Sequence, residues 1–312
     1  MSLYGDRLEK YQHIERLGHD EIRGLLDGSV TIEEKLDGAN ASVAMVDGEF
    51  VVCSRNRALC GPGIEVGERE TFGNLVKWVR EYHREEFEEF FRRFPDAIVR
   101  GEWLQRHSIS YRAEVLNKFY MFDVQGRDGR YAKREFWEPV AIAAGLLVVP
   151  LIAELDHPSA AQVSEFSVGD SLIDPGVKRE GVVAKRYDFV NRFGRTVWGK
   201  VVTADFKQKN SLHFTAANYE GPEMKFVSTE LTSANVMKVI EKIREEKGEV
   251  SVRDMGRVLG EVWYDLVNEE LWDFVKNKKW PVFDFSRAQK LATEKTRDLA
   301  LSYFNGLGME EN

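Results

Sequence analysis

The sequence predicts an α+β protein in which a larger domain of antiparallel sheets and helices precedes a smaller, all-helical domain. Apolar and polar residues alternate along much of the first two thirds of the chain, as in half-buried strands, whereas apolar residues recur at helical spacing after residue 214. The length of 312 residues also exceeds the usual size of one domain. We therefore expect domains at residues 1–215 and 225–312, because Asn218, Gly221 and Pro222 interrupt any regular pattern between them.

The first domain opens with strands over residues 29–56, where Asp47-Gly48 is a strong signal for a hairpin turn. Apolar residues three and four positions apart predict an amphipathic helix over 71–94, closed by Pro95. The other elements expected in this domain are strands at 97–104, 119–124, 146–152, 181–185 and 196–203, and helices at 136–144 and shortly after Pro158. The second domain is expected to hold helices at 234–247, 252–267, 271–278 and 286–304.

Composition narrows the class of protein. Hydrophobic residues make up 43% and charged residues 31% of the chain, and no window approaches the roughly 18 consecutive apolar residues of a membrane span. The first ten residues carry charges of both signs and do not resemble a secretory signal, so we expect a soluble, cytoplasmic protein, in the host cytoplasm if the source is viral. The only cysteines, Cys53 and Cys60, form no zinc pattern and are expected to be free thiols.

Charge is distributed unevenly. The net charge of −8 argues against adhesion of the whole surface to nucleic acid, which depends on neutralising phosphates. Residues 176–209, however, hold nine cations against three acids. This segment is either a local basic groove or a solvated strand face, and charge alone does not separate the two.

Lys35 lies in the string Glu34-Lys35-Leu36-Asp37-Gly38, at the end of a predicted strand. A lysine there can act as a covalent nucleophile if desolvation or nearby cations release its free amine, because the reference pKa of lysine is about 10.4. The alternative is an exposed lysine at a strand-to-turn junction. Chance alone supplies Lys-x-Asp-Gly in about one chain of this length in twelve.

Five further segments follow this string in order, at residues 54–56, 100–104, 119–124, 180–185 and 207–211. The set resembles the covalent nucleotidyltransferases, the superfamily of ATP-dependent DNA and RNA ligases and messenger-RNA capping enzymes, whose signature begins with Lys-x-Asp-Gly. The resemblance spans about residues 30 to 211. It implies a nucleotidyltransferase domain of the ATP-grasp-like ligase fold, with ATP and Mg²⁺ or Mn²⁺ as cofactors.

The resemblance also implies a role for each matching residue. Lys35 would carry AMP, and Lys207 and Lys209 would hold the triphosphate and its developing charge. Glu180, with Asp37, would hold the metal. The remaining nucleotide and phosphate contacts would come from Glu34 and Phe122 at the adenine, Glu102 at the ribose, Arg55 and Asn40 at the incoming 5′-phosphate, and Leu36 beside the lysine. Taken singly, Glu102 and Glu180 are more often ordinary strand-end carboxylates, Phe122 a core aromatic and Arg55 a surface arginine, so the prediction depends on their joint order.

The predicted helical domain separates the branches of this superfamily, because DNA ligases and capping enzymes usually continue into a β-barrel. The chain is most similar to the phage T4 RNA ligase 2 type, although Asp37 stands where that type carries histidine. The implied function is an ATP-dependent RNA ligase that joins 3′-hydroxyl and 5′-phosphate ends through a lysine–AMP intermediate and an adenylated RNA 5′ end. Its expected role is nick or break sealing in RNA repair on ends held by a complementary strand, with no membrane partner and a monomer favoured. The alternatives are a DNA nick ligase, a GTP-dependent capping-type enzyme, or a catalytically silent RNA-binding module.

Overall fold

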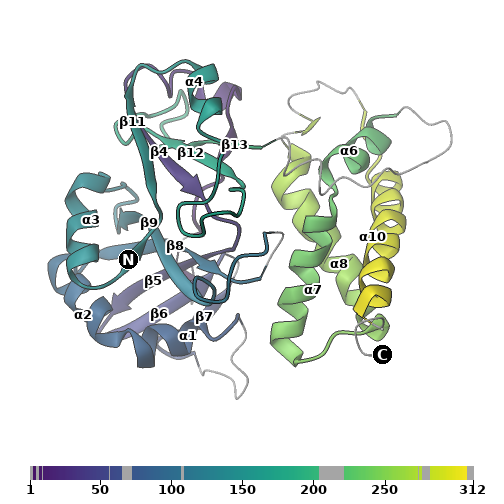
Figure 1. Cartoon of the computed structure of the whole chain (residues 1–312), viewed down its shortest axis with the longest axis horizontal. Coiled ribbons are helices and arrows are strands. Elements are labelled where there is room, and N and C mark those ends of the chain that lie inside the picture. The colour runs from purple at the N-terminus through teal and green to yellow at the C-terminus, as the bar shows by residue number, and fades with distance from the viewer. Residues whose placement is uncertain are drawn as a thin grey trace. The chain divides into compact units, whose positions relative to one another are not determined.

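The computed structural model describes residues 3–4, 7–8, 10–55, 57–64, 72–106, 109–203, 221–272, 274–275 and 282–307. The chain divides into two compact units, at residues 1–203 and 204–312 (Figure 1). Sheets and helices make up the first unit, and the described elements of the second are helices. This mixed α+β architecture confirms the predicted fold class. Within the described residues, no helix combines the length and apolar character needed to cross a bilayer.

A six-stranded sheet forms one layer of the first unit, in the order β10-β9-β8-β5-β6-β7. Its strands are β5 (Ala39–Val46), β6 (Glu49–Ser54), β7 (Ala58–Cys60), β8 (Ala97–Leu104), β9 (Lys118–Gly126) and β10 (Leu147–Val148). All neighbours pair antiparallel except β9 and β10. The helices α1 (Leu75–Lys77), α2 (Arg84–Arg93) and α3 (Arg134–Ala143) contribute to the same buried core (Figure 1).

A five-stranded sheet carries the predicted nucleophile, in the order β11-β4-β12-β13-β3. Its strands are β3 (Glu15–Arg16), β4 (Ser29–Lys35), β11 (Leu151–Asp156), β12 (Gly181–Lys185) and β13 (Gly199–Val202). The short helices η1 (Asp20–Ile22) and α4 (Ala160–Glu165) bury one residue each, Ile22 and Val163, in its core. A separate ribbon pairs β1 (Leu3–Tyr4) with β2 (Arg7–Leu8).

The second unit surrounds a core of aliphatic and aromatic side chains. Its elements are α6 (Pro222–Glu230), α7 (Ser233–Lys247), η3 (Val252–Asp254), α8 (Met255–Leu266), the π-helical turn η4 (Val267–Leu271) and α10 (Phe285–Leu307). Thr232 and Asn235 form a capping box at the start of α7, and Gly248 ends the helix with φ of 88°.

Most elements form where the pattern predicts them, and three differ for local reasons. The turn at Asp47-Gly48 joins β5 to β6, with φ of 52° and 82° as a tight hairpin turn requires. The single helix predicted over 71–94 is instead α1, a π-helical segment η2 (Trp78–Tyr82) and α2, because the backbone breaks at His83. The strand predicted over 146–152 is two strands in different sheets, separated at Pro150, which has no N–H to donate. Pro222, taken as an interruption, occupies the first turn of α6, where proline is favourable.

Candidate active site

Lys35 is the last residue of β4, and its ammonium group points at a carboxylate from the neighbouring strand. The register of β4 with β12 places Lys35 opposite Gly181, the residue directly after Glu180. The distance from Lys35 Nζ to Glu180 Oε2 is 2.6 Å, with the two side chains 25% and 9% exposed. Residues separated by 145 positions in the chain therefore meet at one strand end.

Two glycines allow the strands to approach this closely. A Cβ atom on Gly38 would lie 2.6 Å from the carbonyl oxygen of Trp103, and one on Gly181 would lie 1.9 Å from the carbonyl oxygen of Val201. Both distances are shorter than any side chain tolerates. The Lys-x-Asp-Gly string thus needs glycine for close packing against β8, rather than for a left-handed backbone.

The electrostatics of the pair hold Lys35 in its charged form. Burial alone lowers the pKa of Lys35, but the carboxylates of Glu180 and Glu102 outweigh burial and raise that pKa above its ordinary value. An ammonium group has no lone pair for attack, so the lysine needs a change at Glu180 before it becomes a nucleophile.

The two acidic neighbours of Lys35 are tied to loops rather than left in solvent. Glu34 is buried and accepts a hydrogen bond from the backbone N–H of Leu172 at 2.8 Å. Burial raises the pKa of Glu34. The carboxylate of Asp37, also buried, accepts from the N–H of Ile109 at 2.7 Å, while the Asp37 N–H donates to the hydroxyl of Tyr111 at 3.3 Å.

Glu102 and Asn40 lie on adjoining strands of the six-stranded sheet, and Arg55 directly follows β6. Glu102 Oε1 accepts from the N–H of Gly38 at 3.1 Å. Asn40 lies opposite Glu102 in the pairing of β5 with β8, and the N–H of Arg55 donates to the Asn40 carbonyl at 3.1 Å. The structure thus brings these three predicted residues to the turn that follows Lys35.

Phe122 is the extra residue of a β-bulge in β9, since Arg100 pairs with Asp123 and Gly101 with Met121. Bulges turn a side chain away from the regular alternation of the strand. The ring of Phe122 lies 5.0 Å from that of Tyr11, centroid to centroid.

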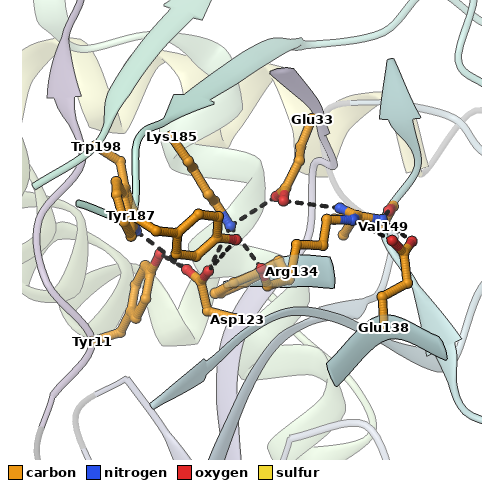
Figure 2. Close-up of polar contacts among 10 residues, drawn as sticks. Tyr11, Glu33, Asp123, Arg134, Glu138, Val149, Lys185, Tyr187 and Trp198 are labelled. Carbon is orange, nitrogen blue, oxygen red and sulfur yellow. Dashed lines mark hydrogen bonds and ion pairs between the residues drawn. The ribbon is translucent and has the colours of Figure 1, made fainter. Parts of the chain in front are cut away.

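A buried polar network links the two sheets (Figure 2). The ammonium of Lys185 lies 2.7 Å from Glu33 Oε2 and 3.0 Å from Asp123 Oδ1, and all three side chains are at most 2% exposed. Arg134 from α3 pairs with Glu33 at 2.8 Å. Three further groups donate hydrogen bonds to Asp123: the Tyr11 and Tyr187 hydroxyls and the Trp198 ring N–H. Lys185 also donates to the Phe122 carbonyl, and Arg134 donates to Glu138 and to the Val149 carbonyl.

This network is the part of the site that the sequence did not predict. The sequence pattern gives no indication that Glu33 and Arg134 belong to the site, since each resembles an ordinary charged residue of an amphipathic strand or helix. Burial raises the pKa of Asp123, and the charge of Lys185 opposes this rise. Both effects follow from where the fold places Asp123, which the spacing of residues in the sequence does not reveal.

The other predicted site residues are placed as follows. Leu36 is buried at 4% exposure, so its side chain belongs to the core. Lys207 and Lys209 lie outside the described residues.

A divalent cation fits this site only in part. No group of three or more histidine, cysteine, aspartate or glutamate side chains in the described residues is arranged to hold a metal. Glu180, which pairs with Lys35, is the candidate oxygen ligand, whereas the Asp37 carboxylate already accepts a hydrogen bond from a backbone N–H. This set suits Mg²⁺, which keeps several waters and takes one or two carboxylates together with substrate phosphates.

Comparison with known proteins agrees with this geometry. The family model for RNA ligases matches residues 28–202, slightly more than half of the chain, and includes Lys35 and Glu180. The chain belongs to the RNA ligase family. No curated protein sequence matches this family member significantly.

Solved structures of an RNA ligase from Naegleria gruberi share the fold of this family member. A variant with AMP and manganese, a variant with ATP and manganese, and the ligase with pyrophosphate each match at 23% identity and a TM-score of 0.50. Each match covers 65% of this chain and 58% of the Naegleria chain. The chain therefore spans less than two thirds of the length of these ligases.

Proposed function

We propose that the protein is an ATP-dependent RNA ligase that joins 3′-hydroxyl and 5′-phosphate RNA ends. The observation that carries this proposal is the position of Lys35, at a strand end 2.6 Å from Glu180 and beside Glu102, Asn40 and Arg55. Membership of the RNA ligase family supports it, as does the fold shared with a ligase solved with ATP and manganese.

In the first step, the Lys35 amine attacks the α-phosphorus of ATP. The bond from that phosphorus to its bridging oxygen breaks, pyrophosphate leaves, and a lysine–AMP phosphoramidate remains. Lys35 must lose a proton for this attack, and Glu180 is its hydrogen-bond partner. A divalent cation at Glu180 would supply positive charge that competes with Lys35 for this carboxylate and neutralises phosphate oxygens.

In the second step, an oxygen of the RNA 5′-phosphate attacks the phosphorus of lysine–AMP, and Lys35 leaves with a proton restored. In the third, the 3′-hydroxyl attacks the RNA 5′-phosphorus, a phosphodiester forms and AMP leaves. Arg55 and Asn40 would hold the 5′-phosphate, for which the planar guanidinium is suited. Glu34 and Phe122 would contact the adenine, Glu102 the ribose, and Lys207 and Lys209 the triphosphate.

We further propose the T4 RNA ligase 2 type of reaction, on nicks or breaks held by a complementary strand. The string from Glu34 to Asn40 supports this, and the helices of the second unit are consistent with it. Asp37 is the departure from that type. Its carboxylate binds the backbone of Ile109, so its contribution includes holding a loop beside the lysine.

The substrate is tested with four labelled nicked duplexes that carry RNA or DNA on either side of the nick. Ligation is measured as the length of the labelled strand on a denaturing gel. We expect sealing to require RNA on at least one side of the nick. Equal sealing of the all-DNA nick would assign a DNA ligase instead, and binding without any joining would assign a silent RNA-binding module.

A further inference from the structure

Two loops of the first unit meet beside the Lys35 site. Residues 109–117 are held through Asp37, which binds both Ile109 and Tyr111. Residues 169–179 are held through Glu34, which binds Leu172. The residues that flank the lysine on each side therefore each anchor one loop.

Arg112 fastens the two loops together. Its backbone N–H donates to Asp174 Oδ2 at 2.7 Å, and its Nε donates to Asp174 Oδ1 at 2.5 Å. The Asp174 side chain is fully buried, whereas the Arg112 side chain is 62% exposed. Asp174 therefore holds the Nε side of the Arg112 guanidinium, while most of the Arg112 side chain stays exposed to solvent.

The two terminal nitrogens of the Arg112 guanidinium are suited to one class of ligand. Among the described residues, neither terminal nitrogen of Arg112 has a hydrogen-bond acceptor. A guanidinium presents its N–H groups as a planar fork that matches two oxygens of a phosphate. Because Asp174 holds Nε, less side-chain entropy is lost when a ligand binds.

We propose that Arg112 is a phosphate-binding residue at the entrance to the Lys35 site and that Asp174 is its positioning residue. The ligand is a phosphate group, supplied either by the RNA strand or by the triphosphate of ATP. The inference rests on the proposed function for the identity of these two sources. It adds a phosphate contact from Arg112, which lies outside the six segments that resemble the ligase motifs.

The test compares Arg112→Met and Asp174→Asn with wild type, and uses Arg130→Met as the matched control. Arg130 also binds an aspartate through Nε, at 2.7 Å from Asp128, but both side chains are exposed and neither belongs to the loops that Glu34 and Asp37 hold. Fluorescence anisotropy measures affinity for a labelled nicked RNA duplex at several KCl concentrations. Formation of protein–AMP in single turnover measures the half-saturating concentration of ATP.

If RNA supplies the phosphate, Arg112→Met weakens duplex binding about tenfold and lowers the slope of log affinity against log salt by about one. If ATP supplies it, the half-saturating concentration of ATP rises about tenfold and RNA binding is unchanged. Asp174→Asn shifts the same quantity by a smaller factor, since the guanidinium remains but is less fixed. Arg130→Met changes neither quantity.

Unchanged ATP and RNA affinities in a folded Arg112→Met protein would overturn the inference. A loss of RNA affinity that leaves the salt slope unchanged would also overturn it, because Arg112 would then only hold the two loops together and would not contact a phosphate. Duplex binding needs no catalysis, so this arm decides about Arg112 even if the wild-type protein seals no nick. Failure of wild type to form protein–AMP or to seal contradicts the proposed function separately.

Discussion

At the scale of single residues, the ion pair of Lys35 and Glu180 would govern the reactivity that we propose for Lys35. The pair holds the Lys35 ammonium 2.6 Å from the carboxylate and favours its protonated form. The same contact would therefore both orient the proposed nucleophile and suppress its attack. Charge brought by the substrate complex at Glu180 would relieve that suppression only when the reaction partners are bound, which protects the amine from side reactions.

Glu180→Gln is expected to separate these two effects. Without the Glu180 carboxylate, one of the groups that raise the pKa of Lys35 is lost, so this pKa falls relative to wild type and more free amine is present at a given pH. Acylation of Lys35 by a small amine-reactive reagent, followed by mass spectrometry, should therefore be faster than in wild type. Adenylylation by ATP should nevertheless fall about a hundredfold or more, because the oxygen that we propose to bind the metal is lost.

Lys178 is the internal control, since it is exposed and should react equally in both proteins. Adenylylation within about twofold of wild type would contradict the role proposed for Glu180.

At the scale of elements, the network around Lys185 joins β4, β9, β12 and α3 (Figure 2). Lys185→Met would leave the Glu33 and Asp123 carboxylates buried with one cation fewer. We expect the free energy of unfolding to fall by about 3–5 kcal/mol in urea titrations, as when one partner of a buried ion pair is removed.

Lys178→Met is the matched control for this measurement. It removes an exposed pair with Asp170, and its cost should stay below about 1 kcal/mol. Equal losses for the two variants would show that the buried network is not a major source of stability.

In the second unit, Lys295 of α10 binds the final turn of α6 through the carbonyls of Val227, at 3.1 Å, and Ser228, at 3.3 Å. Burial lowers the pKa of Lys295 to about 8. Below this value the folded state bears the full cost of the buried charge. As pH rises from about 8 toward the reference value near 10.4, the folded protein is neutral at Lys295 while the unfolded chain is still charged.

The stability of this helix pair should therefore increase over that pH range. Hydrogen exchange of peptides from α6 and α10 measures it, corrected for the intrinsic pH dependence of exchange. Lys295→Met should remove the increase, and an identical pH profile in the variant would contradict the assignment.

At the scale of the whole molecule, the sequence predicts the fold class because local signals agree with the final packing. The hairpin at Asp47-Gly48 and the strand at 181–185 form as expected. The predicted elements differ where the backbone breaks the helical pattern at His83, after the π-helical segment 78–82, and where Pro150 divides one apolar run between two sheets.

The site was predictable to a different extent. Lys35, Glu180 and Glu102 could be predicted together because each belongs to a recognisable motif on or directly beside a strand, and the structure brings the three side chains to one site. Glu33 and Glu34 read alike in the sequence, and only the alternation of β4 sends one to Lys185 and the other to the loop at Leu172. Such partners come from segments about 150 residues apart, which a local pattern cannot pair.

The central claim is that Lys35 carries AMP. Incubation with ATP labelled at the α-phosphate and a divalent cation, followed by denaturing electrophoresis, measures transfer of the label to the protein. We predict an acid-labile label on the wild-type chain that is absent from Lys35→Ala, with GTP giving none. Full labelling of Lys35→Ala, or no labelling of the wild-type chain, would contradict the account.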